Sequence, residues 1–332
     1  MTQRRQFVGA LAASGFVAIL APFRSSAAEP PPETRRIRLV RDPSICLAPL
    51  YVAEELLKQE GFRDVSYVTI EQGQGNSAML ASGKADLGMD AAPALILSLD
   101  AGDPCTILAG VHVGCYELFA TRRIRSACDL KGATIAITQL RDDRHAFVAS
   151  MLSHVGLDPR SDVKWVTQPA EVAMRLLEEG KIDAFLGFPP EPQELRARKI
   201  GHVLLSVLTD RPWSQYFCCM VAANREFARR HPVATRRALR AILKANAICA
   251  AEPERVSKLL VAKGYIAEAK YARQSLQEIP YARWREFDAA DTVRFYALRL
   301  REGGLLRSAP ERILSQGTDF RFLNELKQEL KT

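Results

Sequence analysis

The sequence predicts an α/β protein in which one β-α-β-α-β unit occurs twice. The segment "SGKADLGM" at 82–89 returns as "EGKIDAFL" at 179–186, with Gly-Lys-x-Asp at the same place in both. The strands expected beside these segments are short and apolar, which is typical of strands buried on both faces of a parallel sheet. With 48% hydrophobic and 25% charged residues, the chain can bury a sizeable core. We therefore expect parallel, doubly wound layers.

The first unit begins at 37–40, a β-branched run that predicts a strand. Apolar residues then recur at helical spacing from Leu50 to Leu57. The segment "DVSYV" at 64–68 predicts a second strand, 76–81 a second helix, and "ADLGM" at 85–89 a third strand.

The second unit repeats this order. A strand is expected at 134–137, and apolar residues from Phe147 to Leu152 predict the next helix. The segment "DVKWV" at 162–166 predicts a strand, 169–179 a helix, and "IDAFLGF" at 182–188 the last strand.

Four glycines stand where the helices of the two units should end, at Gly61, Gly83, Gly156 and Gly180. Glycine tolerates the left-handed conformation that such a stop needs. In Gly-Lys-x-Asp the lysine then lies near the negative helix end and the aspartate caps the turn. We expect the motif to be a helix stop that contacts no ligand.

The N-terminus has the pattern of a secretory signal. Arg4 and Arg5 precede sixteen uncharged residues, and small residues follow up to Ala28. The apolar stretch is shorter than the roughly 20 residues of a comfortable membrane span. We expect residues 1–28 to be a signal peptide of the twin-arginine type, which exports folded proteins. The alternative is an uncleaved anchor.

Charge argues against a nucleic-acid partner. Removal of residues 1–28 takes away three arginines and no acid, so the formal charge falls from +8 to +5. The remaining Lys and Arg are spread among acids, without a basic stripe. They are typical of a solvated surface.

Seven cysteines remain after this removal, without the spacing of a disulfide framework. His112, Cys115 and the pair Cys218–Cys219 are conceivable metal ligands, but no second pair with ligand spacing follows. We expect buried cysteines that behave as small hydrophobes, and no metal. A disulfide is possible in an oxidising periplasm, but the sequence does not identify the pair.

Several motifs in a fixed order resemble a known family. They are "LAPLYVAEE" at 47–55, "LASGKADLGM" at 80–89, "DLKGATIAI" at 129–137, "VGLDP" at 155–159, "EGKIDAFLGF" at 179–188, and the stretch from "PWSQYFCCMVAANREF" through 245. They are similar to periplasmic solute-binding proteins of ABC importers, in the branch that serves nitrate, alkanesulfonates, taurine and the pyrimidine precursors of thiamin.

The resemblance implies a two-lobe periplasmic binding protein fold of type II, the Venus-flytrap arrangement, with two doubly wound lobes and a two-segment hinge. Lobe one is expected at 31–116 plus 222–332, and lobe two at 117–221. The crossing strands are expected in "CYELFATR" and "YFCCMVAA", which are apolar and β-prone.

Ligand contacts are expected in loops at the carboxyl ends of the strands, where open α/β sheets bind ligands. The candidates from both lobes are Ser44, Cys46, Gln74, Gly75, Asn76, Asp90, Ala91, Tyr116, Arg141, Phe188, Glu191, Trp213 and Tyr216.

Several of these residues have a structural alternative. The glycine-rich 72–76 is either an anion site or an ordinary turn. The aromatic residues either stack on a ligand or belong to the core, and Glu191 accepts from a ligand amine or stabilises a helix start. Asp142 or Asp143 can cap the helix that follows, which favours a larger organic ligand of mixed polarity over nitrate or simple alkanesulfonates. Arg141 and Arg144 either restore positive potential or pair with those aspartates.

The expected function is a monomeric periplasmic protein that delivers a small organic solute to an ABC permease in the inner membrane. The solute classes considered are sulfonates, taurine-like compounds, aromatic acids and pyrimidine precursors. No cofactor, metal or nucleic acid is expected. The alternatives are a periplasmic ligand sensor, which would bind in the same way, and an exported enzyme related to pyrimidine synthases.

Overall fold

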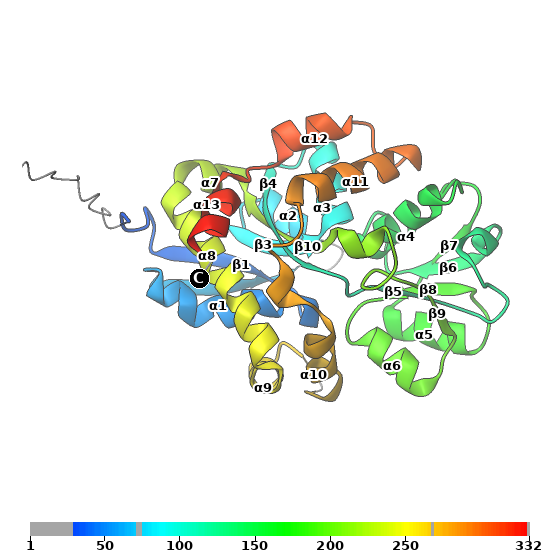
Figure 1. Cartoon of the computed structure of the whole chain (residues 1–332). Coiled ribbons are helices and arrows are strands. Elements are labelled where there is room, and N and C mark those ends of the chain that lie inside the picture. The colour runs from blue at the N-terminus through cyan, green and yellow to red at the C-terminus, as the bar shows by residue number, and fades with distance from the viewer. Residues whose placement is uncertain (1–28, 71–74, 267–268, 331–332) are drawn as a thin grey trace, which may run out of the picture. The chain divides into compact units, whose positions relative to one another are not determined.

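Two five-stranded mixed sheets, with helices packed against both, organise residues 31–332 (Figure 1). The structure is a computed structural model that describes residues 29–70, 75–266 and 269–330. The expected signal peptide at 1–28 and the candidate Gln74 therefore lie outside the described residues. Of the helices in the described ranges, none is both long enough and apolar enough to cross a membrane.

The first sheet has the order β2-β1-β3-β10-β4. Its first three strands are parallel, and β10 runs antiparallel to both of its neighbours. The strands are β1 (Arg36–Arg41), β2 (Asp64–Thr69), β3 (Leu87–Ala91), β4 (Cys105–Val113) and β10 (Phe217–Asn224), and the helices between them are α1 (Ala48–Gln59), α2 (Asn76–Ala81) and α3 (Ala92–Ala101).

The second sheet repeats the arrangement with the order β7-β6-β8-β5-β9. Here β5 is the strand that runs antiparallel to its neighbours. The strands are β5 (Glu117–Ala120), β6 (Thr134–Ile137), β7 (Lys164–Thr167), β8 (Ala184–Gly187) and β9 (His202–Ser206), with helices α4 (Asp143–His154), α5 (Ala170–Glu178) and α6 (Glu191–Arg198).

The parallel pairing expected within the two units is confirmed, and the strands that run antiparallel are β5 and β10. Neither strand belongs to the duplicated units. Each lies where the chain passes from one sheet to the other. Each is antiparallel to the strands beside it. Within the units, the expected strands and helices are confirmed to within about four residues.

The C-terminal third is helical and returns to the first sheet. The long α8 packs on α1, and α11 packs on both α3 and α4, so α11 contacts helices that follow strands of both sheets (Figure 1). These helices are α7 (Arg225–Arg230), α8 (Pro232–Ala251), α9 (Pro253–Ala262), α10 (Ala269–Glu278), α11 (Ala289–Glu302), α12 (Pro310–Gly317) and α13 (Arg321–Glu329), and the short 3-10 turns are η1 (Ile45–Leu47), η2 (Ala127–Leu130), η3 (Trp213–Gln215) and η4 (Tyr281–Arg283).

The core is densest around β4 and β10. Every residue of β4 is buried, as are the first seven of β10. Gly110 leaves room for the ring of Phe217, because a Cβ added there would lie 2.2 Å from that ring. A well-packed interior has no space to absorb such an overlap.

The repeated Gly-Lys-x-Asp is a helix stop, as expected. Gly83 and Gly180 have φ of 69° and 67°, and Gly61 and Gly156, at 102° and 78°, confirm the other pair of stops. The expected role of the aspartates was wrong, because they do not cap their own turns. They instead accept hydrogen bonds from a neighbouring strand.

The two aspartates make the same contact in the two sheets. The Asp86 carboxylate accepts from the backbone N–H of Arg38 at 2.7 Å, and that of Asp183 accepts from the backbone N–H of Thr134 at 2.8 Å. Each carboxylate also pairs with an arginine, Arg38 or Arg123. The motif therefore fixes β3 to β1 and β8 to β6.

Candidate functional site

A cavity of about 500 Å³ lies between the carboxyl ends of strands from the two sheets. On the first sheet, the cavity is lined at the ends of β1 and β3 and along α2 and α3. On the second sheet, it is lined by the loop between β6 and α4 and by the residue after β8. The lining residues are Asp42, Ile70, Gly75, Asn76, Ser77, Ala78, Asp90, Ala94, Leu97, Ser98, Ala101, Asp103, Thr138, Gln139, Arg141, Asp142, Asp143, Arg144 and Phe188.

Carboxylates from both sheets face this cavity and repel one another. Burial, and then the charge of Asp143, raise the pKa of Asp90 to about 8. The same two causes raise the pKa of Asp142 to about 6. Burial is also the main cause of the raised pKa of Asp42, with Asp143 again contributing. A positive charge in the cavity would relieve this repulsion.

The positive charge of Arg144, on the side of the cavity formed by the second sheet, is neutralised by an ion pair. Its guanidinium donates to both carboxylate oxygens of Glu191, at 2.7 and 2.8 Å, and to the carbonyl oxygen of Leu186. Arg144 therefore pairs with Glu191, and not with Asp142 or Asp143. The Glu191 carboxylate is occupied by this pair and does not serve as a free acceptor for a ligand amine.

The start of α4 is occupied by the protein's own carboxylate. Asp142 is the N-cap and accepts from the backbone N–H of His145 at 2.8 Å and from that of Gln139 at 2.8 Å. The Asp143 carboxylate accepts from the hydroxyl of Tyr116. The expectation that one of these aspartates caps the helix is confirmed, so the helix start offers an incoming anion little.

The first sheet's side also presents hydrogen-bond acceptors. Asn76 donates through Nδ2 to the Asp42 carboxylate at 3.0 Å. Its Oδ1 is buried and has no hydrogen-bond partner among the described residues. A buried acceptor without a partner costs free energy, so a ligand donor would be favoured here.

Phe188 supplies an aromatic surface to the cavity wall. Its ring lies 4.4 Å from the Arg144 guanidinium carbon and 5.8 Å from the Tyr116 ring centroid. The side chain is partly exposed, which leaves ring surface toward the cavity.

The structure brings five of the predicted site residues to the cavity: Gly75, Asn76, Asp90, Arg141 and Phe188. Tyr116 and Glu191 stand directly behind the wall, through their contacts with Asp143 and Arg144. Ala91 is buried at the end of β3. Ser44 and Cys46 are buried around η1 and do not line the cavity.

Trp213 and Tyr216 lie elsewhere, against α11. Tyr216 stacks on Phe295 with centroids 3.9 Å apart, and Trp213 meets the same ring edge-on at 5.3 Å. For Trp213 and Tyr216 the structure therefore favours the second alternative, packing in the core, over stacking on a ligand.

Asp42 and Asp103 line the cavity but were not among the sequence candidates. Asp42 follows β1 directly, so its place at a carboxyl strand end was a usable signal. Asp103 lies after α3, and nothing in its local sequence indicates the cavity.

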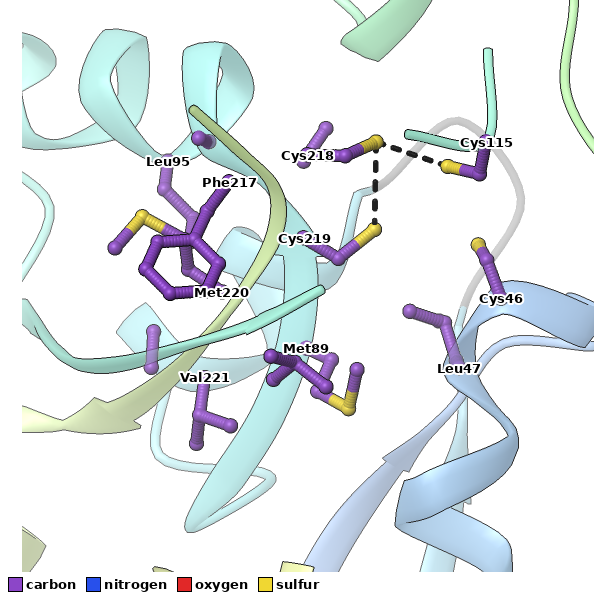
Figure 2. Close-up of a cluster of buried hydrophobic side chains, with 14 of the residues drawn as sticks. Cys46, Leu47, Met89, Leu95, Cys115, Phe217, Cys218, Cys219, Met220 and Val221 are labelled. Carbon is purple, nitrogen blue, oxygen red and sulfur yellow. Dashed lines mark hydrogen bonds between the residues drawn. The ribbon is translucent and has the colours of Figure 1, made fainter. Parts of the chain in front are cut away.

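A second group of side chains has the chemistry of a metal site. Cys46, His112, Cys115 and Cys219 are buried, and their potential ligand atoms all lie within 4.8 Å of one another. The sulfur atoms of Cys46, Cys115, Cys218 and Cys219 converge in Figure 2. None of these residues lines the acidic cavity.

Comparisons with known proteins agree on the fold. A family model described as NMT1/THI5 like matches residues 45–256. The chain is similar to the periplasmic nitrate-binding protein NrtA from Synechocystis PCC 6803, with 16% identity, a TM-score of 0.73, and 91% of this chain and 90% of that chain covered. No curated protein sequence matches the chain.

Two further solved structures have a similar fold. The alkanesulfonate-binding protein SsuA from Xanthomonas axonopodis pv. citri, bound to MOPS, is 17% identical with a TM-score of 0.68, over 89% of this chain and all of that chain (100%). The desulfurization enzyme DSZB is 16% identical with a TM-score of 0.58, over 89% of this chain and 100% of that chain. At these identities the likeness shows the two-lobe periplasmic binding protein fold.

Proposed function

The chain belongs to the NMT1/THI5-like family, and we propose that it is an exported solute-binding protein that captures a small organic solute carrying a protonated amine. It delivers this solute to an ABC permease in the inner membrane. The observation that carries the proposal is that Asp42 and Asp90, from the first sheet, and Asp143, from the second, face one cavity of about 500 Å³.

A cationic group offsets the repulsion among these carboxylates. It also stabilises the ionised form of Asp90, whose pKa burial and Asp143 raise to about 8. An ammonium group has three N–H donors, and Asn76 Oδ1 is an acceptor without a partner among the described residues. The ring of Phe188 then covers an apolar or aromatic part of the solute.

This chemistry favours two of the four expected solute classes. Taurine-like compounds carry an ammonium group, and the amino group of pyrimidine precursors offers N–H donors to carboxylates without a charge of its own, whereas simple sulfonates and aromatic acids carry only negative charge. The site has little to bind a lone anion, because Glu191 holds Arg144 and Asp142 caps α4. Arg141 remains at the cavity rim and can meet an anionic end of a zwitterionic solute.

Capture requires the two lobes to close on the solute. In this proposal the lobes are the expected 31–116 plus 222–332 and 117–221, except that 217–221, the first part of β10, moves to lobe one. Because β10 pairs with β3 and β4 along its length, the second crossing segment in this arrangement lies before Phe217. A carrier then needs only a higher affinity in the closed state than in the open state, with no activated catalytic group.

The test is a binding measurement with matched solutes on the purified protein. Taurine and isethionate have the same sulfonate and chain length, and differ in an ammonium group against a hydroxyl. Benzylamine, which is protonated near neutral pH, and benzoate extend the comparison to aromatic solutes. We expect the amine-bearing member of each pair to bind about tenfold more tightly or better, a difference of about 1.4 kcal/mol. Preference for isethionate and benzoate would contradict the amine assignment.

An enzyme is the competing function, because the desulfurization enzyme DSZB has a similar fold. Among the described residues that line the cavity there is no histidine, cysteine or lysine. Histidine is the commonest general acid or base, and cysteine and lysine are common nucleophiles, but aspartate and serine, which do line the cavity, can also serve. Incubation with excess solute, followed by chromatography, should return the solute unchanged. Product formation would favour the enzyme.

Export by the twin-arginine route is the proposed path to the periplasm. Replacement of Arg4 and Arg5 by lysine should retain the protein in the cytoplasm, while Arg24→Lys, outside the pair, should leave export unchanged. Cell fractionation measures both. If the double-lysine variant still reached the periplasm, the protein would be exported by a route other than the twin-arginine route.

A further inference from the structure

Three segments that are far apart in the chain bring one histidine and three cysteines together. Cys46 lies in η1, the 3-10 turn that follows β1 after a short loop, and Cys115 follows β4 by two residues. His112, in β4, is the cross-strand partner of Cys219 in β10. All four side chains are buried, and no pair of their potential ligand atoms is more than 4.8 Å apart.

These separations are close to those of a tetrahedral zinc site. With Zn–S bonds of about 2.3 Å, two sulfur ligands of one zinc ion lie about 3.8 Å apart. No separation here exceeds this value by more than about 1 Å, which small side-chain rotations can close. Three sulfurs and one imidazole nitrogen form one of the ligand sets that structural zinc prefers.

Each ring nitrogen of His112 lies near a backbone carbonyl oxygen, so binding an ion requires one nitrogen to turn from its carbonyl while the other keeps its contact. Nε2 lies 3.1 Å from the carbonyl oxygen of Cys46, and Nδ1 lies 3.3 Å from that of Val113. A neutral imidazole has one N–H, so it donates to one carbonyl and keeps a lone pair on the other nitrogen. Such a contact fixes the tautomer and ring orientation.

Polar neighbours are available to the sulfur atoms. Ser44 Oγ lies 3.0 Å from the sulfur of Cys46. A fifth sulfur, that of Cys218, lies 2.9 Å from the sulfur of Cys115 and can donate its S–H (Figure 2). Three thiolates around a divalent ion leave one excess negative charge, and these donors would stabilise it.

The backbone at Cys115 supports a built site. Gly114 and Cys115 both have positive φ, 71° and 126°. A side chain makes this conformation unfavourable at Cys115, and such strain persists only where the surroundings over-determine it. Here the positive φ angles turn the chain between β4 and β5 and keep the Cys115 side chain close to the other sulfur atoms.

We propose that Cys46, His112, Cys115 and Cys219 bind one thiophilic divalent ion, zinc, in a tetrahedral structural site that ties β1, β4 and β10 together. Binding replaces three thiol protons by the ion and transfers no electron, so it requires no oxidant. The expected export of folded protein would allow the ion to be acquired in the reducing cytoplasm, before the thiols meet oxidising conditions.

The test is the metal content of the full chain, expressed with its own signal in zinc-containing medium and purified without chelator. Elemental analysis should find one zinc ion per chain. Replacement of zinc by cobalt should produce the absorption bands of tetrahedral cobalt–thiolate, in the visible and near ultraviolet. The cobalt spectrum requires no mutation, so it tests the site even if every variant misfolds.

Variants then identify the ligands. Cys219→Ser and His112→Ala should each lose the zinc and alter the cobalt bands. Cys249→Ser is the matched control, because Cys249 is also buried but lies in α8, outside the cluster. It should keep one zinc per chain and the wild-type cobalt spectrum.

Two results would overturn the proposal. One is reduced protein that takes up neither zinc nor cobalt. The other is metal-free exported protein in which mass spectrometry finds a Cys115–Cys218 disulfide, which would make these sulfurs an oxidised pair. Solute binding is measured separately, so neither result changes the test of the amine-binding function.

Discussion

The guanidinium of Arg144, in the wall of the acidic cavity, and the carboxylate of Glu191, behind that wall, form an ion pair through two hydrogen bonds. The two hydrogen bonds are 2.7 and 2.8 Å long, and Arg144 is 2% exposed. The geometry is the parallel fork in which arginine binds carboxylates most specifically. Because this pair neutralises the one buried arginine of the wall, the carboxylates facing the cavity determine its charge.

Glu191→Gln should change which solutes bind. It leaves the Arg144 charge without its partner, so affinity for amine-bearing solutes should fall and affinity for sulfonates should rise, as calorimetry can measure. Removing one partner of a buried pair costs about 3–5 kcal/mol of stability. Glu194→Gln, in the same helix but in an exposed pair with Arg198, is the control and should alter neither quantity. Unchanged selectivity in Glu191→Gln would contradict this account of the cavity charge.

Asp90 should make the solute-free protein less stable as pH rises. Its carboxyl has a folded-state pKa of about 8 against an ordinary value of 3.8, mainly through burial. Between these values the unfolded chain ionises while the folded protein keeps the proton, so stability is present at low pH and is lost as pH rises through about 8. Asp90→Asn removes this loss, on the order of 2 kcal/mol because cavity water screens the partly exposed carboxyl.

Urea unfolding at pH 5 and pH 9 measures this effect, with the exposed Asp64→Asn as control. The difference between the two pH values should shrink in Asp90→Asn alone. An amine solute should also bind the wild type more tightly as pH rises toward 8, as long as its own amine stays protonated. Equal pH dependence in all three proteins would show that Asp90 titrates normally.

Phe188→Ala should weaken solute binding about tenfold or more, because it removes an aromatic face worth about 1–3 kcal/mol. Lys84→Ala and Lys181→Ala should leave affinity unchanged, since neither lysine lines the cavity. Isothermal titration with the best solute compares the three variants. If the lysine variants lost affinity and Phe188→Ala did not, the site would lie at the opposite ends of the strands.

Asp86→Ala and Asp183→Ala should each destabilise the protein without changing solute selectivity. Each substitution leaves a strand N–H and an arginine without their acceptor, which costs about 2–3 kcal/mol. Denaturant unfolding provides the measurement, and Asp64→Ala is a control, because both partners of its salt bridge to Arg36 are exposed. A change in solute selectivity in either variant would contradict the prediction that the Gly-Lys-x-Asp motif has only a structural role.

The duplicated units were predictable because their signals are local. Apolar periodicity, β-branched runs and helix-ending glycines such as Gly83 and Gly180 depend on a few neighbouring residues. The direction of β5 and β10 was not predictable in this way, because an isolated strand pattern is the same in parallel and antiparallel sheets. Their direction follows from the path of the chain between the sheets.

Part of the candidate site was also predictable. Asn76, Asp90 and Phe188 follow from the rule that ligands bind beyond the carboxyl ends of strands. The rule gives positions along the chain and no partners. It therefore left open whether Glu191 faces a ligand or Arg144, and whether Tyr216 faces the cavity or Phe295.

The sequence by itself determined the two β-α-β-α-β units, their helix stops and the strand ends at which a ligand can bind, because these depend on the conformational preferences of short segments. Only the tertiary structure decided the charge of the cavity and the convergence of Cys46, His112, Cys115 and Cys219. Both depend on side chains from distant segments meeting within a few ångströms, where burial and Coulomb repulsion change their chemistry.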